Sequence, residues 1–388
     1  MNICILGRQP EIGLAELESL YGAQNVEPTE NGCALVNAEI DFDRLGSSVK
    51  TGEVLMSVPT TNPQKLFFHC KKILPKMLRD LPEGKIKLGV SMIGYDMPVH
   101  KINANVLSLK KIIRSYDRSI RVIPNQSPVL SSAQTYHNQL TSPLGIEFVF
   151  VRHKDQSIIA RTTHVQDIDA YRIRDRDRPK RDAFVGMLPP KLAQTIINLA
   201  TGTATLSKET IVLDPFCGTG VVAIEASLMG SGTYSTDISK RMIDYTSRNL
   251  TWISEKNQLD VSQRIEIADA RDHIWRQPVS CIASEGYLGQ PIGGNAPEPA
   301  KLRRIIDECN TIARDFLRNI ADQIQPDTRL CLALPVWYVN NKTHYLPLLD
   351  ETEALGFSRI SFVHSPGELI YRRDDQPVGR YLLTLSRP

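Results

Sequence analysis

The sequence predicts an α/β fold in which a doubly wound, mainly parallel sheet follows two smaller α+β units. Three observations lead to this prediction. From residue 185 onward, short apolar runs typical of strands alternate with amphipathic stretches typical of helices. The first complete strand of this series runs into a glycine-containing loop and a further helix. Upstream, the charge-dense segment 171–181 separates this pattern from the N-terminal part.

The composition is that of an ordinary globular protein. The chain has 388 residues, which is long enough for two or three domains, and 41% of them are hydrophobic. A net charge of +3 permits a nucleic-acid partner without arguing for one. The seven cysteines and eight histidines are dispersed without metal-ligand spacing, so we expect no metal. With no signal peptide and no membrane-length apolar run, we expect a cytoplasmic protein without a membrane partner.

The N-terminal part is expected to contain two α+β units, residues 1–80 and 81–168, followed by a linker at 169–184. The first unit is predicted to form strands at 2–6, 34–36 and 54–58, with helices at 10–20 and 66–78. The second is predicted to form strands at 87–93, 121–123, 146–151 and 157–162, with helices at 103–116 and 131–140. Basic residues lie on the polar side of helix 103–116, where clustered cations favour phosphate binding.

The C-terminal part, residues 185–388, is expected to form the doubly wound sheet. Its predicted strands are 211–214, 232–237, 264–267, 279–283 and 330–334, and its predicted helices begin near residue 188 and span 221–229 and 240–252. A β-hairpin with strands at 369–373 and 380–385, joined by a turn at 374–377, is expected to close the sheet.

Acidic residues follow three successive predicted strands. The first strand ends in Asp214-Pro-Phe-Cys-Gly-Thr-Gly220, whose glycines allow the backbone to approach a ligand closely. Asp237 ends the next strand, where a carboxylate accepts hydrogen bonds from ribose hydroxyls, and Asp269 ends the third, where it would face an adenine amino group. Each aspartate alone is also a common turn former. Three aspartates at the ends of three successive strands favour a cofactor site. The predicted cofactor-binding residues are Asp214, Phe216, Cys217, Gly218, Thr219, Gly220, Asp237, Ile238, Asp269 and Ala270.

The spacing of this loop favours S-adenosyl-L-methionine over a nicotinamide dinucleotide. A dinucleotide-binding loop has the pattern G-x-G-x-x-G, with its first glycine directly after the strand. Here three residues separate Asp214 from Gly218, and Ala223 stands where the third glycine is expected. A dehydrogenase is therefore disfavoured.

Several segments of the sequence resemble a known family. The segment 214–220 resembles the first motif of class I methyltransferases that act on exocyclic amino groups of bases. The stretch 178–194 resembles the entry to the catalytic domain of the THUMP-domain tRNA guanosine-N2-methyltransferases. Segments 6–17 and 163–175 and the hairpin 371–385 are similar to the same family, so the resemblance extends over nearly the whole chain.

The resemblance implies a fold, a reaction and partners. It implies a ferredoxin-like unit at 1–80, a THUMP RNA-binding domain at 81–168, a linker at 169–184 and a Rossmann-like class I methyltransferase domain at 185–388. The implied reaction transfers a methyl group from S-adenosyl-L-methionine to the N2 amino group of a guanosine in tRNA. The residues do not decide whether a small activator subunit takes part. The predicted RNA contacts are Lys110, Lys111, Arg114, Arg121, Arg174 and Arg178, although Asp175 and Asp177 make intrachain ion pairing an alternative for the last two.

The chain departs from the family after its fourth strand. The family carries Asp/Asn-Pro-Pro-Tyr/Phe there, and its polar side chain holds the target amino group while its aromatic ring stacks on the base. Here the segment is Ser284-Glu-Gly-Tyr-Leu288, so we predict that Glu285 and Tyr287 are the catalytic residues. Two alternatives stay open at this point. The first alternative to guanosine-N2 methylation is an RNA-binding protein with a catalytically impaired methyltransferase domain, and the second is a methyltransferase that acts on adenine N6 or on rRNA.

Overall fold

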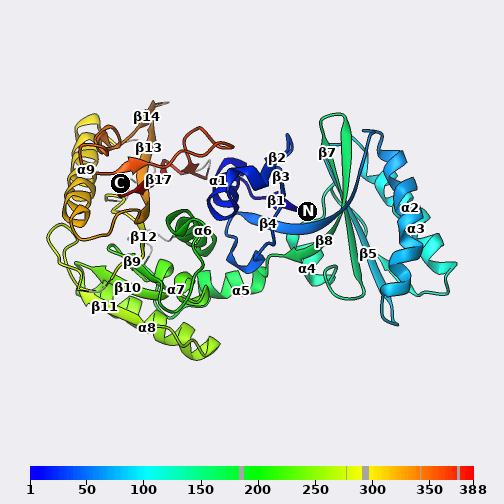
Figure 1. Ribbon diagram of the computed structural model, residues 1–388, viewed down its shortest axis with the longest axis horizontal. Coiled ribbons are helices and arrows are strands. Elements are labelled where there is room, and N and C mark those ends of the chain that lie inside the picture. The colour runs from blue at the N-terminus through cyan, green and yellow to red at the C-terminus, as the bar shows by residue number, and fades with distance from the viewer. Residues whose placement is uncertain (183–187, 277, 291–296, 341, 374–375) are drawn as a thin grey trace. The chain divides into compact units, whose positions relative to one another are not determined.

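A computed structural model describes all residues except 183–187, 277, 291–296, 341 and 374–375 (Figure 1). Contacts divide the chain into two units. The first unit comprises Met1–Pro10, Gln24–Asp43 and Ser48–Ala170, and the second comprises Glu11–Ala23, Arg44–Ser47 and Tyr171–Pro388. The predicted turn at 374–377 and the predicted domain start at residue 185 involve residues outside the described ranges. The predicted domain boundaries therefore stay predictions.

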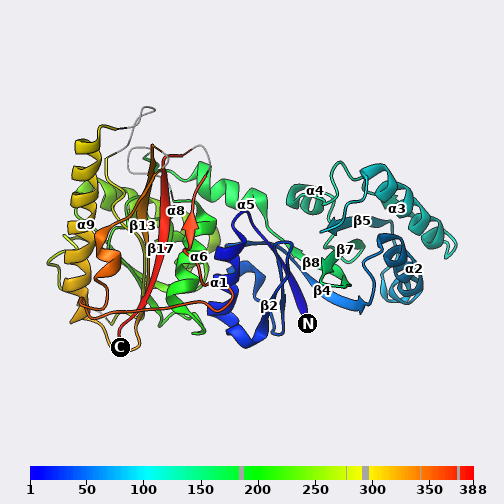
Figure 2. The same ribbon diagram turned by 90° about the horizontal axis from the view of Figure 1, so that it is seen from above.

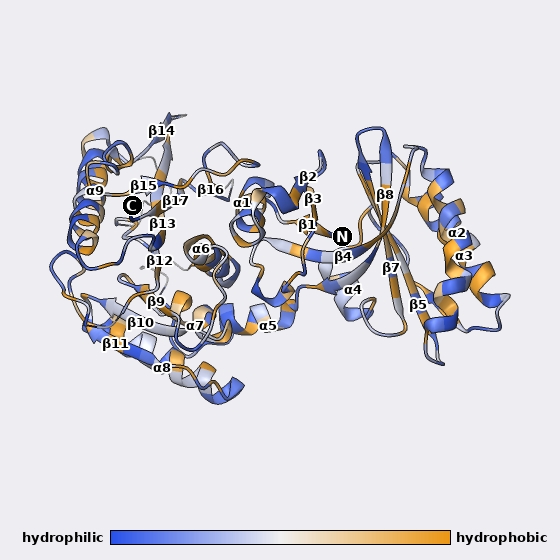
Figure 3. Ribbon diagram, viewed as in Figure 1, coloured by the Kyte–Doolittle hydropathy of each residue, from blue (hydrophilic) through white to orange (hydrophobic). Residues whose placement is uncertain are grey.

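The first unit is built on one eight-stranded mixed sheet. Its strands lie in the order β2 (Val26–Pro28), β3 (Cys33–Val36), β1 (Asn2–Leu6), β4 (Ser48–Val58), β8 (Gln156–Val165), β7 (Gly145–His153), β5 (Ile86–Ile93) and β6 (Ile120–Val122). Helices α2 (Pro63–Asp80) and α3 (Val99–Arg114) pack side by side and share a hydrophobic core with β5 and β7, as Figure 1 shows; α4 (Ser132–His137) is short. In Figure 3, apolar and hydrophilic residues alternate along α2 and α3, as expected for helices buried on one side only.

The second unit contains the doubly wound sheet. Its strand order is β11 (Gln263–Ile267), β10 (Gly232–Asp237), β9 (Ile211–Asp214), β12 (Cys281–Glu285), β13 (Arg329–Val339), β17 (Val378–Ser386) and β15 (Ser358–Arg359). The first five are parallel, and β17 runs antiparallel to β13. Short strands β14 (Lys342–His344) and β16 (Ile370–Tyr371) pair with β13 and β17. The predicted α/β fold of this part of the chain, including the antiparallel C-terminal hairpin, is confirmed, whereas the division of the N-terminal part into ferredoxin-like and THUMP units stays a prediction.

Helices cover both faces of this sheet. Helix α6 (Pro190–Thr201) packs on β12 and β13, with α7 (Val221–Leu228) and then α8 (Lys240–Asn257) beside it. Helix α9 (Pro299–Ala321) packs on the opposite face, and Figure 2 shows α6 and α9 on the two sides of β13 and β17. From β9, the chain extends the sheet in one direction with β10 and β11 and then in the other direction with β12 and β13. This change of direction lies between β9 and β12, and open α/β sheets bind ligands at such a position.

Two parts of this unit differ from the prediction. Helix α9 was not predicted, although its apolar residues Leu302, Ile305 and Cys309 recur at helical spacing on the buried side. The charged segment predicted as a linker is helical from residue 168, as α5 (Ile168–Arg172) and the π-helical turn η3 (Ile173–Asp177). Its stabilising partner is the buried Glu225 of α7, which receives a hydrogen bond from Arg174 and is distant in sequence.

The N-terminal helix α1 (Pro10–Tyr21) belongs to the second unit rather than the first. Its apolar residues pack against α6. The carboxylate of Glu16 is fully buried and accepts hydrogen bonds from the backbone N–H of Gly46 (3.0 Å) and Ser47 (2.8 Å) and from the Asn198 amide (2.7 Å). The carboxylate of Glu18 accepts the backbone N–H groups of residues 363 and 364. Polar as well as apolar contacts therefore tie α1 to the second unit.

Three short 3-10 turns complete the structure: η1 (Ala23–Asn25), η2 (Phe42–Arg44) and η4 (Pro347–Asp350). In the part of the chain that the structure describes, no helix is both long enough and apolar enough to cross a membrane.

Candidate active site

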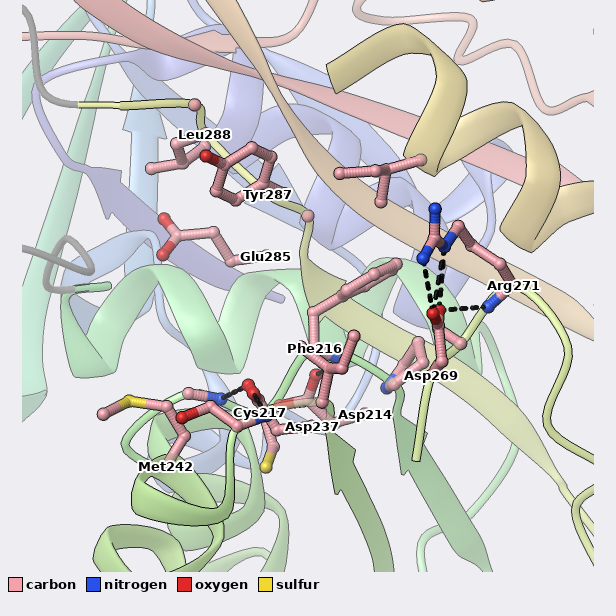
Figure 4. Close-up of a pocket in the computed structure, with 18 of the residues that line it drawn as sticks. Asp214, Phe216, Cys217, Asp237, Met242, Asp269, Arg271, Glu285, Tyr287 and Leu288 are labelled. Atoms are coloured by element: carbon pink, nitrogen blue, oxygen red, sulfur yellow. Dashed lines mark hydrogen bonds and ion pairs between the residues drawn. The ribbon is translucent and has the colours of Figure 1, made fainter. Parts of the chain in front are cut away.

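A pocket of about 860 Å³ opens at the carboxyl ends of β9, β10 and β12, beside the reversal in strand order. A pocket of this size accommodates a nucleoside-sized ligand. Figure 4 shows the loop after β9 next to Asp237, with Glu285 and Tyr287 on the segment at the end of β12. The predicted residues that line it are Asp214, Phe216, Cys217, Gly218, Thr219, Asp237, Ile238, Asp269, Ala270, Glu285 and Tyr287.

The glycine loop is shaped by two left-handed residues. Gly218 has a φ of +53° and Gly220 a φ of +80°, both of which favour glycine. A Cβ atom on Gly220 would lie 2.9 Å from the Thr246 methyl carbon, so a larger residue would separate α7 from α8. Gly220 does not line the pocket. It is the residue that precedes α7, and its predicted contact with the cofactor stays a prediction.

Asp237 joins the glycine loop to the end of β10. One carboxylate oxygen accepts the backbone N–H of Gly218 at 3.0 Å, and the other accepts that of Ser239 at 2.8 Å. Burial raises the pKa of this carboxyl, and the two hydrogen bonds oppose that increase. The adjacent Ile238 side chain is exposed at the pocket, where it presents an apolar surface. This combination suits a ribose next to a flat base.

Asp214 lies at the bottom of the pocket and is buried. The Ser284 hydroxyl donates a hydrogen bond of 2.6 Å to its carboxylate. Burial raises the pKa of Asp214 to about 7, despite this hydrogen bond. The neighbouring carboxylates of Asp237 and Glu285 add to the increase because they repel a second negative charge. The site therefore favours a cationic ligand group near Asp214.

This raised pKa predicts a pH-dependent stability. Between about pH 4 and pH 7, Asp214 is protonated to a greater extent in the folded chain than in the unfolded chain. Its contribution to the free energy of unfolding therefore falls as the pH rises through this range and is constant above about pH 7. Asp214→Asn keeps an acceptor for Ser284 and removes the charge. Without cofactor, the variant is expected to match the wild type near pH 4 and to exceed its free energy of unfolding by about 2–4 kcal/mol at pH 8. Urea unfolding at both pH values measures this difference, and an equal stability at pH 8 would contradict it.

Asp269 is already engaged by a cation. The guanidinium of Arg271 donates hydrogen bonds of 2.6 to 3.1 Å to both carboxylate oxygens and lowers the pKa of this carboxyl. An adenine amino group at the predicted position would therefore share the Asp269 carboxylate with Arg271. Arg271 was not predicted as a site residue, although it follows Asp269 by only two positions in the sequence.

The opposite part of the pocket carries the altered motif. Glu285 is the last residue of β12, and the N–H of Gly286 donates to the carbonyl of Ala333 at 3.0 Å. Tyr287 is 37% exposed, so its ring is accessible at the pocket. The guanidinium of Arg380, on β17, forms an ion pair with the Glu285 carboxylate. Sequence reasoning missed this partner. It also missed the lining residues of α9, because that helix was not predicted: Asp307, Glu308, Thr311 and Ile312.

Cys217 lines the pocket as a buried thiol. Its sulfur lies 3.4 Å from the Thr246 hydroxyl, and burial raises the pKa of the thiol well above its usual value. A thiol in this state is a poor nucleophile. Cys217 therefore contributes shape and packing to the loop.

Two of the predicted RNA contacts, Arg174 and Arg178, are largely buried in this structure. Arg178 is only 3% exposed, and its guanidinium makes no hydrogen bond to any residue that the structure describes. Arg174 points inward and donates to Glu225 at 2.8 Å. Both cations come from the charged segment that was predicted as a linker, and their contact with RNA stays a prediction. The other four, Lys110, Lys111, Arg114 and Arg121, lie on α3 and β6 of the first unit with exposed or partly exposed side chains.

Comparison with known proteins places the chain in a family. Residues 178–280 match the RMKL-like methyltransferase domain family. A tRNA (guanine(10)-N2)-dimethyltransferase of Pyrococcus abyssi is 35% identical over 271 residues, which cover 69% of this chain and 70% of that protein. This chain belongs to the tRNA guanine-N2-methyltransferase family.

Other members of the tRNA guanine-N2-methyltransferase family match shorter segments. The enzyme of the same name from Methanothermobacter thermautotrophicus is 30% identical over 173 residues, covering 44% of this chain, and the one from Methanocaldococcus jannaschii is 31% identical over 136 residues, covering 34%. These segments span 44% and 36% of the two relatives' own lengths. Among solved structures, TrmN from Thermus thermophilus has a TM-score of 0.53 at 16% identity, covering 100% of this chain and 99% of its own, which supports the fold.

Proposed function

We propose that the chain is an S-adenosyl-L-methionine-dependent methyltransferase that modifies the N2 amino group of a guanosine in tRNA. One observation carries the proposal. A single pocket brings together the glycine loop, the aspartates at three successive strand ends and a carboxylate at the end of β12. The glycine loop and the aspartates suit the cofactor, and the carboxylate at the end of β12 suits an amino group of a base. The family membership and the tRNA substrate in the relatives' names support it.

The pocket residues fit the cofactor chemically. Asp237 has unused lone pairs for the ribose hydroxyls, and Ile238 offers an apolar surface for adenine. The buried carboxyl of Asp214 favours the positively charged part of the ligand. When bound, S-adenosyl-L-methionine supplies a methyl group on a positively charged sulfur. Phe216, Cys217 and Thr219 then shape the wall around it.

The remaining residues position the base. An exocyclic amino nitrogen is a weak nucleophile because its lone pair is delocalised into the ring, so orientation supplies much of the rate. Glu285 accepts hydrogen bonds from the amino group and takes the proton that leaves as nitrogen gains the methyl carbon. The ring of Tyr287 stacks on the base. A target inside folded tRNA is turned out of its stack to reach this position.

Helices α2 and α3 provide the surface for RNA. Within these two helices, Asp80 is the only acidic residue. The ring of Phe68 is exposed, and the Lys72 ammonium lies 4.5 Å from its centre. Clustered cations with an accessible aromatic ring suit phosphates and an unpaired base. The exposed or partly exposed cations of the two helices are Lys65, Lys71, Lys72, Lys76, Arg79, Lys101, Lys110, Lys111 and Arg114. We place the THUMP RNA-binding domain in this unit, at 81–168, and the whole protein in the cytoplasm with its tRNA.

The basic surface gives a prediction about tRNA affinity. The triple variant with alanine at Lys110, Lys111 and Arg114 is expected to bind tRNA at least tenfold more weakly. The slope of log affinity against log salt is expected to fall by about two to three, because each phosphate contact contributes about one. Filter binding across a salt series measures both values. A matched triple variant at Lys154, Lys208 and Lys256, which are exposed cations outside α2 and α3, should change neither. Equal losses in the two triples would contradict the assignment.

Methyl transfer to tRNA tests the proposed function directly. The wild type is expected to transfer the labelled methyl group to unmodified tRNA, and nucleoside analysis is expected to yield N2-methylated guanosine. Glu285→Ala is expected to lower kcat at least 100-fold while cofactor affinity by calorimetry changes less than threefold, because Glu285 serves the base. If the wild type binds cofactor yet methylates no RNA, the enzyme assignment fails and an RNA-binding role remains. N6-methyladenosine as the product would overturn the choice of guanosine.

A further inference from the structure

The Glu285–Arg380 ion pair crosses a strand of the sheet. Glu285 ends β12, Arg380 lies on β17, and β13 runs between them. Glu285 is in register with Ala333, and Arg380 with Pro335, so all four residues lie on the same face of the sheet. Ala333 and Pro335 are small, which lets the arginine reach across β13. Both charged side chains are largely buried, at 14% and 10% exposure.

This pair limits the conformations of Glu285. The Nε–H of Arg380 donates to Oε1 of Glu285, whereas Oε2 accepts no hydrogen bond from the residues that the structure describes. Glu285 lines the pocket, so a base that enters the pocket can reach its free acceptor positions. A carboxylate held by an arginine offers acceptors only, and it offers two of them side by side.

The edges of the bases differ in how they match two adjacent acceptors. Guanine presents N1–H and the N2 amino group next to one another, which are two donors at the spacing of the two carboxylate oxygens. Adenine presents its N6 amino group beside the lone pair of N1, and cytosine presents its N4 amino group beside the lone pair of N3. A carboxylate would repel either lone pair. A site that hydrogen-bonds a substrate N–H discriminates strongly against an analogue without it.

We propose that Glu285, held in place by the positioning residue Arg380, selects guanine by accepting hydrogen bonds from N1–H and N2–H together. This inference rests on the proposed function and adds the group that reads the base. It also accounts for the departure from the Asp/Asn-Pro-Pro-Tyr/Phe pattern, since the longer Glu285 side chain is the one that Arg380 contacts. An amide at this position would offer one donor and one acceptor, which is the arrangement that adenine matches.

The experiment compares two bases that carry the same reacting amino group. The methylated position is first mapped, and tRNA is then prepared with guanine or 2-aminopurine at that position. Both have an amino group at C2, but 2-aminopurine has a lone pair at N1 instead of N1–H. The wild type is expected to prefer guanine at least 100-fold in kcat/KM. Glu285→Gln is expected to reduce this preference to less than tenfold, because its amide N–H can donate to the lone pair.

Variants of Arg380 test the positioning role. Arg380→Met is expected to lower kcat and to reduce the preference for guanine at least tenfold, with cofactor affinity unchanged. Arg380→Lys is expected to restore part of the preference, because it keeps the charge. Melting temperatures confirm that each variant is folded. If Arg380→Met does not fold, the Glu285→Gln comparison decides alone.

The outcomes separate the two proposals. No methylation of guanine by the wild type refutes the proposed function. Methylation of guanine with the same preference over 2-aminopurine in the wild type and Glu285→Gln refutes the inference and leaves the function standing.

Discussion

Asp237→Ala is expected to weaken S-adenosyl-L-methionine binding at least 100-fold. The substitution removes the acceptor proposed for the ribose hydroxyls, and it leaves the N–H groups of Gly218 and Ser239 without their partner. Hydrogen bonds to a charged group contribute about 1.5–3 kcal/mol each, so losing two to the ligand corresponds to a factor of 100 or more. Calorimetric titration of the purified chain with the cofactor measures this change.

A matched control separates binding from folding. Asp244 lies on α8 of the same unit and is exposed, and Asp244→Ala removes the same charge away from the pocket. It should bind the cofactor within twofold of the wild type. Asp237→Asn keeps one acceptor for the glycine loop and should melt close to the wild type while binding at least tenfold more weakly. Normal affinity in a folded Asp237→Asn protein would mean that the ribose is bound elsewhere.

Glu16→Ala is expected to destabilise the second unit by about 3–5 kcal/mol. Three donors that the Glu16 carboxylate now satisfies, on Gly46, Ser47 and Asn198, would lose their acceptor in the interior. Buried donors without partners cost about 1–3 kcal/mol each, and part of that cost is recovered because a buried carboxylate is removed.

The tryptophans make this measurement specific. All three, Trp252, Trp275 and Trp337, lie in the second unit, so their fluorescence during urea unfolding reports on that unit alone. The midpoint is expected to fall in Glu16→Ala and to stay unchanged in Glu11→Ala, whose side chain is exposed on the same helix. An unchanged midpoint in Glu16→Ala would show that the three hydrogen bonds of Glu16 contribute no stability to this unit.

Much of the fold was predictable because its strands and helices carry local patterns. The strands 2–6, 211–214 and 232–237 end where the sequence predicted, since apolar runs stop at turn residues. The first half of β4 was missed because Lys50 looks like a surface residue. It is buried, and its ammonium pairs with Glu147 at 2.7 Å from a strand almost a hundred residues later. A pattern within one segment contains no information about such a partner.

The same reason explains what was missed at the site. The cofactor loop is one continuous segment, so its residues could be named from sequence. Arg380 reaches Glu285 across β13, and Arg174 reaches Glu225 from a separate helix. Both pairings depend on strand order and helix packing, which follow only once the sheet is assembled. The burial of Arg178 was missed for the same reason, because a charged segment is normally solvated unless a folded neighbour covers it.

The placement of α1 also has a consequence for synthesis of the chain. Helix α1 is made near the start of translation, but α6, the helix on which it packs, is made much later. At typical rates of elongation this interval is roughly ten to thirty seconds. During that time the apolar side of α1 is exposed on the nascent chain while the first unit, whose strands other than β1 are made in between, is able to fold. The N-terminal segment therefore cannot be exchanged as an independent cassette, because part of it completes the catalytic unit.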